Sequence, residues 1–449
     1  MTALPHLFVL VDMEVEGVGI RGISSEGLPP KWFTKDPTTT FEEDLPAMRA
    51  VITHAAETAA GSGYASYFDF WRDLYEGQKK WAESEGHPPL LANLGVSLIE
   101  RAVIDAMARR LGESFGTLLR SNVFGIRAGE IDSDLGECSP GDLLPSAPLR
   151  DVAARHTIGL GDPLSEEDID DPLEDGLPHS LEESIRAYGL RYFKIKICGD
   201  LETDRGRLAR IREILERETG GDYRTTFDGN EQFANMNSFR EHWDVYRNDP
   251  AIAPLLDHIL FVEQPIHRDH ALADSVRDEL EAWADAPRFI IDESEADLSS
   301  LPRALSLGYT GTSHKNCKGI VKGVLNAMRL ERLRRESPGT EWILSGEDLA
   351  NVGPVALLQD LAVMTSLGIA HVERNGHHYF QGLSAFPESL QREVLQCHSD
   401  LYRRHDRGFP AVKIEEGRIE MGSIVDAPFG VAVDPLHFSE IGSIDGSVG

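Results

Sequence analysis

Eight short apolar stretches recur between residues 152 and 400, and each is followed by a helical or loop stretch. They are rich in β-branched and aromatic residues, which is typical of buried strands. Strands that alternate with helices indicate a parallel α/β sheet, and eight such units in about 250 residues match a (β/α)8 barrel. The stretches are VAARHTIGL, RYFKIKI, YRTTFD, HILFVEQ, RFIIDES, YTGTSHK, EWILSGE and GIAHVER.

The region before this series has a different pattern. Residues 1–150 begin with two strand-like stretches, LFVLVDMEVEG and VGIRGIS, and continue with long helical patterns such as SLIERAVIDAMARRLGESF. A run of strands followed by a run of helices indicates an α+β domain. The sequence therefore predicts an α+β domain at 1–150 and a barrel domain at 151–404.

The chain is strongly acidic. Its 449 residues carry 44 basic and 75 acidic side chains, a net charge of −31, which argues against nucleic acid or an acidic membrane as a partner. The four cysteines are scattered and form no CxxC pair, so they indicate neither a disulfide framework nor a cysteine zinc site. No apolar run reaches the roughly 18 residues of a membrane span. We expect a cytoplasmic homo-oligomer that acts on a small molecule.

Charged side chains end five consecutive predicted strands, between 23 and 35 residues apart along the chain. Each step fits one βα unit, and the C-terminal ends of barrel strands share one rim, where active sites lie. We therefore expect these groups to meet at the barrel mouth. They are Lys194 and Lys196, Asp228 and Asn230, Glu263, Asp292 and Glu293, and Lys315.

Three carboxylates that converge at one point repel one another and are costly to desolvate. A hard divalent cation resolves this conflict, and all-oxygen ligation suits Mg²⁺, with Mn²⁺ as the alternative. Lysines beside such a site can act as acid and base, because a cation or a second ammonium lowers a lysine pKa. This interpretation explains why Lys194 and Lys196 alternate with apolar residues in a strand: both point into the barrel mouth.

Each motif alone has an ordinary explanation. A single DGN or DES more often marks a turn or a helix cap, and lysines on strands usually face solvent. The order of the set on five successive strands is what favours the catalytic interpretation.

The ordered motif set resembles that of the enolase superfamily, in its muconate-lactonizing and mandelate-racemase branch. The start of the chain resembles the capping domain of that family, and the tail IVDAPFGVAVD resembles the strand that returns to it. The likeness covers nearly the whole chain. Its motifs are KIK (194–196), DGN (228–230), EQP (263–265), DES (292–294) and the strand-six lysine Lys315.

The resemblance implies a modified barrel at 151–404 under an α+β capping domain at 1–150, which the tail at 405–449 completes. It also implies abstraction of a proton α to a carboxylate, which gives a metal-stabilised enediolate. Lys196 and Lys315 would be the acid/base pair on opposite faces of the substrate. Lys194 would lower the pKa of Lys196 and contact the substrate carboxylate. The implied metal ligands are Asp228, Glu263 and Asp292.

The chain departs from the family pattern after strand six. The family usually has a Gly-Gly pair shortly after this lysine, whereas CKGI offers one glycine and Lys318 as a rival base. We prefer Lys315 because it ends the strand. No histidine with an aspartate partner is evident on strand seven, so the mandelate-racemase type of base is not expected.

Further candidates for substrate binding lie beside the main motifs. Asn230 and Glu293 neighbour the implied metal ligands. Glu347 and Asp348 end strand seven in SGED, where they would bind substrate or support the site. His377 and His378 follow strand eight in NGHHYF, where they would reach the substrate or lie on a surface loop.

Two aromatic segments of the N-terminal domain are candidates for setting specificity. The stretch SSEGLPPKWF at 24–33 combines glycine, two prolines and the aromatic pair Trp32 and Phe33, which predicts a mobile lid. The cluster YASYFDFW at 64–71 is either a second closing segment or part of the core of the domain, because aromatics at helical spacing usually pack.

The sequence thus predicts a Mg²⁺-dependent racemase, epimerase or cycloisomerase that acts on a small-molecule carboxylate. An acid-sugar dehydratase that uses the same enediolate is the first alternative, because the group β to the acid decides the product. The second alternative is a non-catalytic relative that serves as a binding module.

Overall fold

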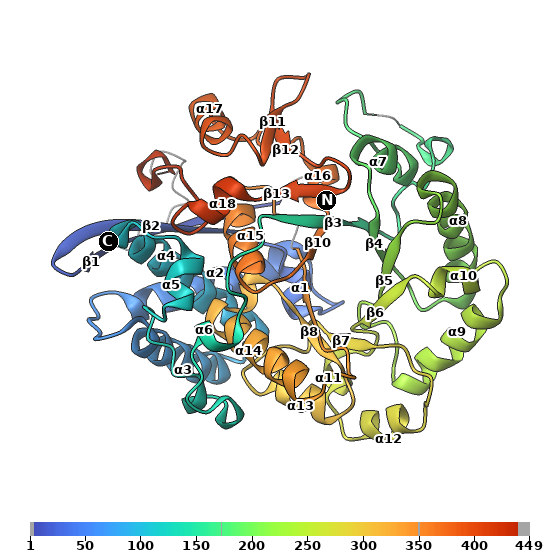
Figure 1. The fold of residues 1–449 in the computed structure, drawn as a ribbon, viewed down its shortest axis with the longest axis horizontal. Coiled ribbons are helices and arrows are strands. Elements are labelled where there is room, and N and C mark those ends of the chain that lie inside the picture. Colours follow the sequence, from blue (N-terminus) through green and yellow to red (C-terminus); the bar gives the residue numbers. More distant parts are fainter. Residues whose placement is uncertain (1–3, 172, 349–350, 439–449) are drawn as a thin grey trace.

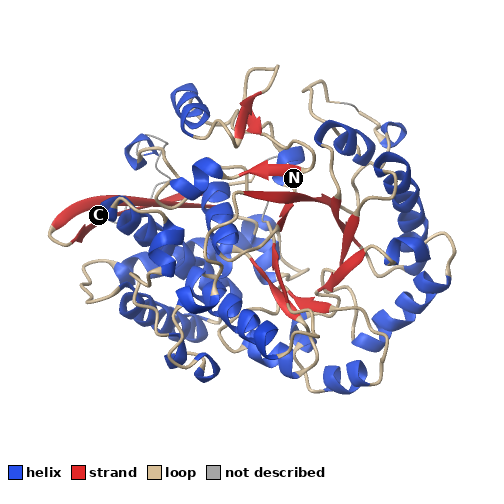
Figure 2. Ribbon diagram, in the orientation of Figure 1, coloured by secondary structure: helices blue, strands red, loops and turns tan. Residues whose placement is uncertain are grey.

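The computed structural model describes residues 4–171, 173–348 and 351–438. In this part of the chain, eight parallel strands form a barrel that closes by pairing of β10 with β3. Figure 2 shows the ring of strands with helices around it. The predicted (β/α)8 barrel is confirmed, and each of the eight stretches contains one strand. The strands are β3 (Asp151–Ile158), β4 (Tyr192–Lys196), β5 (Arg224–Asp228), β6 (Ile259–Glu263), β7 (Phe289–Ile291), β8 (Gly311–His314), β9 (Ile343–Gly346) and β10 (His371–Arg374).

Barrel strands are buried on both faces, and alternate side chains face the helices and the interior. In β4, Phe193 and Ile195 are fully buried and belong to the main hydrophobic core. Lys194, between them, is also buried, but it contacts carboxylates from other barrel strands. The period of two in this strand therefore sends its lysines to the interior face.

Helices cover the outside of the barrel and link successive strands (Figure 1). Several begin with a side-chain cap, as α8 does where Asp200 accepts the backbone N–H of Thr203. The helices from β3 onward are α7 (Leu181–Tyr188), α8 (Leu201–Thr219), α9 (Met236–Asn248), α10 (Ala253–Leu256), α11 (Arg268–Ala271), α12 (Ser275–Glu281), α13 (Ser300–Ser306), α14 (Ile320–Glu336), α15 (Ala356–Ser366), α16 (Gly376–Tyr379) and α17 (Glu388–Cys397).

The N-terminal region is an antiparallel hairpin packed on helices, as predicted for an α+β unit. β1 (His6–Val15) pairs with β2 (Val18–Gly27), and β2 packs on the long buried helix α4. A side chain at Gly22 would place its Cβ 2.0 Å from the carbonyl oxygen of Ala102 in α4, so this packing requires glycine. The helices of this region are α1 (Pro30–Thr34), α2 (Phe41–Ala59), α3 (Tyr67–Glu85), α4 (Pro89–Leu111), α5 (Phe115–Arg120) and α6 (Pro140–Leu143).

The two aromatic segments differ in the structure. In the 64–71 cluster, Tyr67, Phe68 and Trp71 are buried in the core from α3, so this cluster packs and does not close over a site. The stretch 24–33 is not one loop, because residues 24–27 belong to β2 and are buried. Phe33 is also fully buried, which corrects its place in the predicted mobile lid.

The C-terminal segment returns to both the barrel and the N-terminal helices. β13 pairs antiparallel with residues 151–153 of β3. Phe429 packs on Phe115 with ring centroids 4.9 Å apart, and Arg109 donates to the carbonyl of Val431 at 2.8 Å. Residues 439–449 of the predicted tail lie outside the described residues, and the domain limits remain a prediction. The segment contains β11 (Tyr402–Arg404), β12 (Pro410–Val412), β13 (Arg418–Glu420) and α18 (Gly422–Asp426).

None of the helices described here combines the length and the apolar character needed to cross a bilayer.

A buried ion pair joins β2 to α4 and to the segment after β9. The fully buried guanidinium of Arg101 donates to the Glu26 carboxylate at 3.0 Å and to the carbonyl of Ser25 at 3.0 Å. The other Glu26 oxygen accepts from the Asn351 amide at 2.8 Å. Because both charges are removed from water, each depends on the other.

We predict that Arg101→Met destabilises the protein by about 3–5 kcal/mol, because it leaves the Glu26 carboxylate buried without its cation. Urea unfolding followed by circular dichroism measures the change. Arg332→Ala is the matched control, because Arg332 pairs with Glu336 on the surface, where such pairs contribute at most about 1 kcal/mol. Equal unfolding midpoints for the two variants would show that the buried pair is not needed.

Candidate active site

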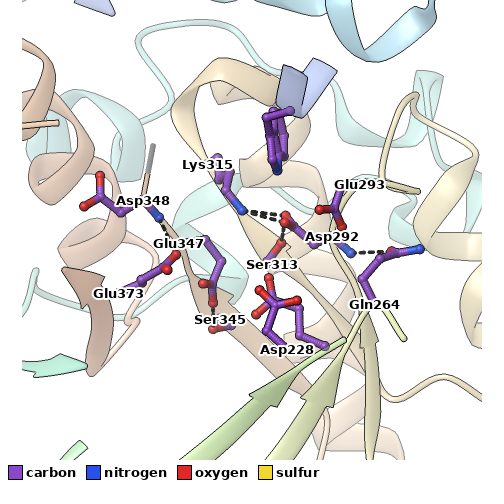
Figure 3. Close-up of polar contacts among 12 residues, drawn as sticks. Asp228, Gln264, Asp292, Glu293, Ser313, Lys315, Ser345, Glu347, Asp348 and Glu373 are labelled. Carbon is purple, nitrogen blue, oxygen red and sulfur yellow. Dashed lines mark hydrogen bonds and ion pairs between the residues drawn. The ribbon is translucent and has the colours of Figure 1, made fainter. Parts of the chain in front are cut away.

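Carboxylates from four barrel strands, or from the residues just after them, meet at the C-terminal end of the barrel, around the ammonium group of Lys194. Its Nζ lies 2.9 Å from Asp228, 2.8 Å from Glu263, 2.6 Å from Glu347 and 3.3 Å from Glu373. Figure 3 shows Asp228, Glu347 and Glu373 among the polar side chains of this site. The structure thus brings together residues up to 179 positions apart in the sequence.

The four carboxylates decide the charge of Lys194. Burial lowers the pKa of this lysine, but the negative charges of Asp228, Glu263, Glu347 and Glu373 outweigh it and raise the pKa well above the usual range. Lys194 is therefore a buried cation whose charge these carboxylates balance.

Asp292 is the centre of a second group of contacts. Lys315 lies 2.7 Å from both carboxylate oxygens, Lys318 lies 2.8 Å from one of them, and the Ser313 hydroxyl donates at 2.5 Å. Burial raises the pKa of Asp292, but the lysines outweigh it and hold the pKa well below the usual range. Figure 3 shows the Lys315 and Ser313 contacts with this carboxylate.

The structure brings both candidate lysines of the strand-six region to Asp292, but it engages them differently. Lys318 lies in a 3-10 turn and also donates to the backbone oxygen and the hydroxyl of Ser313, at 3.1 and 2.9 Å. Lys315 directly follows β8, and its hydrogen bonds go to Asp292. Lys318 is therefore held by Ser313 as well as by Asp292, whereas the hydrogen bonds of Lys315 among the described residues all go to Asp292.

Lys196 lies at the end of β4, with its ammonium 2.5 Å from Asp228. Its side chain is 20% exposed, in contrast to the nearly inaccessible Lys194. β4 and β8 are four positions apart in the ring of eight strands. Lys196 and Lys315 therefore enter the mouth from opposite sides, with the strands of Asp228, Glu263 and Asp292 following β4 in order.

Asp228, Glu263 and Asp292 supply the oxygen ligands that a divalent cation such as Mg²⁺ prefers, but among the described residues they do not bring one oxygen each within 4.8 Å of the others. Neither buried oxygen of Glu263 accepts a hydrogen bond among the described residues, and one of them lies 2.8 Å from the Lys194 ammonium. Burial, Glu347, Asp228 and Asp292 raise the pKa of Glu263 well above its usual range despite the Lys194 charge. Extra positive charge at this point would satisfy these oxygens, and an all-oxygen set from adjacent strands suits Mg²⁺ or Mn²⁺.

One electrostatic expectation is not met by the protein's own groups. We expected a lowered pKa for Lys315, and burial does lower it, but the charge of Asp292 outweighs burial and raises the pKa above the usual range. A lowered value would require a cation that neutralises Asp292. The sequence-based expectation took into account a bound divalent cation and the charge of Lys194, both of which lower a lysine pKa. It did not take into account that Lys315 pairs directly with Asp292, a predicted metal ligand, which raises the pKa of Lys315.

Glu347 is fully buried and belongs to the supporting network of the site. It is paired with Arg155 and Lys194, and the Ser345 hydroxyl donates to it at 2.5 Å. Burial raises its pKa, but Arg155 and Lys194 outweigh this and hold the pKa well below the usual range. Its neighbour Asp348 pairs with Arg374.

Sequence analysis missed two members of this network, Glu373 and Arg155. Glu373 is the strand-end acid of GIAHVER, and it accepts from the Thr157 hydroxyl at 2.6 Å as well as contacting Lys194. The same rule that selected Glu263, an acid near the end of a barrel strand, would have found it. Arg155 was detectable as an unusual charge inside the strand VAARHTIGL, at an alternate position with Thr157.

Asn230 and Glu293 lie side by side near the mouth. The Asn230 amide donates to Glu293 at 3.4 Å, and its backbone N–H donates to Asp228 at 2.8 Å. Burial and the neighbouring acids Asp292, Glu231 and Asp228 raise the pKa of Glu293 to about 7. Both residues thus border the carboxylate cluster.

Trp32 covers the lysines from the side of the N-terminal region. Its ring centroid lies 4.9 Å from the ammonium of Lys315 and 6.0 Å from that of Lys318, which places a cation against the aromatic face. Arg268 donates to the backbone oxygens of Trp32 and Phe33, at 3.0 and 2.8 Å. Helix α1 is therefore attached to the loops of the barrel mouth.

The two histidines after β10 lie elsewhere. His377 and His378 contact the ring of His156 on β3, with centroids 5.1 and 4.6 Å apart. Within the described residues, neither has a hydrogen bond or ion pair with the carboxylates around Lys194. The structure does not bring His377 to the group of predicted site residues.

The closed parallel barrel, the N-terminal hairpin with its helices and the returning C-terminal segment together define a capped barrel. The chain has the fold of the mandelate racemase/muconate lactonizing branch of the enolase superfamily. No protein-family model matches the sequence. No curated protein matches it either.

Solved structures support this fold over nearly the whole chain. A muconate cycloisomerase from Pseudomonas fluorescens is 16% identical, with 98% of this chain and 95% of that chain covered and a TM-score of 0.56. A dipeptide epimerase from Enterococcus faecalis V583 is 15% identical, with 92% of each chain covered and a TM-score of 0.55. A mandelate racemase/muconate lactonizing enzyme from Bordetella bronchiseptica RB50 is 14% identical, with 96% of each covered and a TM-score of 0.57.

Proposed function

We propose that this protein is a divalent-cation-dependent isomerase of the mandelate racemase/muconate lactonizing type, which removes the proton α to a carboxylate. The reaction class is racemisation, epimerisation or cycloisomerisation. The observation that carries the proposal is the placement of Lys196 and Lys315 on opposite sides of a buried carboxylate cluster. Racemases, epimerases and cycloisomerases among the structural neighbours support it.

In this mechanism one lysine removes the proton from one face of the substrate Cα, and the other lysine adds a proton to the opposite face. The neutral Nζ of one lysine takes the proton from Cα, and the C–H electron pair moves into the carboxylate to form an enediolate. The ammonium of the other lysine returns a proton to the opposite face, which inverts the centre. Each lysine must therefore be neutral in one direction of the reaction and charged in the other.

Asp228, Glu263 and Asp292 would hold the cation, and Mg²⁺ bound there supplies positive charge that stabilises the enediolate. Lys194 keeps its positive charge throughout and balances Glu347 and Glu373 beside this site. Trp32 excludes water from the lysines on the side of the cap. In this proposal, helix α1 is the lid that selects the substrate.

The proposal is tested by screening carboxylates for deuterium incorporation at Cα in D₂O. Exchange with retention of all other atoms supports an isomerase. Exchange with loss of a β-hydroxyl would support the dehydratase alternative, and stoichiometric binding without exchange would support the binding-module alternative. The homo-oligomer and the cytoplasmic location remain predictions.

We predict that activity depends on Mg²⁺ or Mn²⁺ bound by Asp228, Glu263 and Asp292. Exhaustive chelation should abolish exchange, and added Mg²⁺ should restore it, because the bound ion supplies the charge that stabilises the enediolate and contacts the Glu263 oxygens, which accept no hydrogen bond among the described residues. Isothermal titration should detect one Mg²⁺ site per chain that Glu263→Gln weakens. Full turnover after chelation would rule out this dependence.

We predict that Lys315→Ala abolishes exchange from one enantiomer of a racemised substrate and that Lys196→Ala abolishes exchange from the other. Loss of a positioned base should slow the affected direction by roughly 10²–10⁴-fold. Chiral chromatography with mass detection of deuterium measures both directions.

The same assay decides between the candidate lysines. If Lys315→Ala exchanges both enantiomers normally while Lys318→Ala does not, the base is Lys318. If Lys196 alone is needed, a one-base lyase mechanism replaces the isomerase. Circular dichroism of each variant serves as the folding control.

We predict that Trp32→Ala raises KM or changes substrate preference, because it removes the aromatic surface over Lys315. The matched control is Trp342→Ala, which removes a tryptophan just before β9, at the opposite end of the barrel. Steady-state kinetics on several carboxylates compares the two variants. Wild-type kinetics of Trp32→Ala on all of them would show that α1 is not the lid.

A further inference from the structure

A second group of potential ligands lies on the outer face of the barrel, apart from the carboxylate cluster. Side chains alternate along β3, so Arg155 and Thr157 face the interior, where they contact Glu347 and Glu373. His156, between them, faces outward. Figure 1 shows α16, which follows β10, beside β3.

Three imidazole rings meet at this place. His156 contacts His377 and His378 of α16, and one ring nitrogen from each histidine lies within 4.8 Å of the other two. The Nδ1 of His156 and the Nε2 of His377 are 3.1 Å apart. Two nitrogens bound to one tetrahedral Zn²⁺ at 2.0–2.1 Å would be separated by about 3.3 Å, so this pair is already near the required spacing.

The rings have free nitrogen atoms despite their burial. Both nitrogens of His378 and the Nδ1 of His377 are buried without a hydrogen-bond partner in the described chain. Buried polar atoms without a partner are rare in native proteins, and a bound ion or water molecule commonly satisfies them.

The surroundings offer a fourth ligand and a cavity beside the rings. The Asp162 carboxylate lies 3.8 Å from Nε2 of His378, and the backbone N–H of Gly159 holds it at 2.7 Å. His156, Asp162 and His378 line a cavity of about 160 Å³ between β3 and α7. The cavity has room for a water molecule as a further ligand.

We propose that His156, His377 and His378 bind a Zn²⁺ ion, with Asp162 or a water molecule as the fourth ligand. Three imidazoles and one oxygen favour Zn²⁺ over Mg²⁺, which prefers oxygen ligands. The ion would join β3 to the segment after β10. These two strands close the barrel, so the site is structural and independent of the proposed reaction.

The test uses the full-length protein, stripped of metal by chelation and then kept in excess Mg²⁺ to occupy the carboxylate site. Isothermal titration with Zn²⁺ should show one site per chain, and titration with Co²⁺ should give the visible spectrum of a tetrahedral nitrogen-rich site. Bound Zn²⁺ should raise the melting temperature, because it binds the folded state.

His377→Gln and His378→Gln should each weaken Zn²⁺ binding by more than the roughly 10–100-fold that loss of an outer-sphere partner costs. His179→Gln is the matched control, because His179 lines the same cavity but is paired with Asp175 at 2.8 Å; it should bind Zn²⁺ like the wild type. Anomalous scattering at the zinc edge from wild-type crystals should place the ion among the three rings. This measurement does not depend on the folding of any variant.

Two results would overturn the proposal. The first is that the protein binds no Zn²⁺ when excess Mg²⁺ occupies the carboxylate site. The second is uptake that Asp292→Asn removes and His378→Gln leaves unchanged, which would place the ion at the carboxylates. In either case the close approach of His156 and His377 is an ordinary hydrogen bond between two rings.

Discussion

The barrel mouth depends on one buried ammonium group. Lys194 neutralises carboxylates that arrive from β5, β6, β9 and β10, and without this charge their mutual repulsion would oppose closure of the barrel. The same lysine stands between two halves of the site. On one side lie the acids suited to a cation, and on the other lie Glu347 and Glu373, which Arg155 and Thr157 fix in place. The contacts of Lys194 thus determine both the arrangement of these carboxylates and the balance of their charge.

Much of the fold could be predicted from the sequence because local pattern and global topology agree. Strand stretches such as RYFKIKI alternate with helices, and this alternation determines a parallel barrel. The convergence of Asp228, Glu263 and Asp292 follows from their positions at the ends of successive strands. The region 24–33 was harder, because glycine and proline indicate a turn but do not show where β2 ends or that Phe33 is buried.

The contacts of the remaining site residues could not be predicted, because they cross the barrel. Glu373 is recognisable from the sequence as an acid near the end of a strand, but its contact with Lys194 joins strands far apart in sequence. Lys315 and Lys318 are three residues apart, and only the hydrogen bonds of Lys318 with Ser313 separate their surroundings. The position of His377 beside His156 depends on closure of β10 against β3, which a linear pattern does not reveal.

The antiparallel pairing of β13 with the start of β3 has a consequence for biosynthesis. The residues of β3 are synthesised well before those of β13. Residues 151–153 can therefore pair with residues 418–420 only after the latter have left the ribosome. The ring of Phe115 likewise packs against Phe429 only after Phe429 has been synthesised. Synthesis proceeds from the N-terminus, so the nascent chain carries an unfinished sheet and an open aromatic surface until residues 418–429 have been made. The final assembly of both regions therefore follows the synthesis of all eight barrel strands.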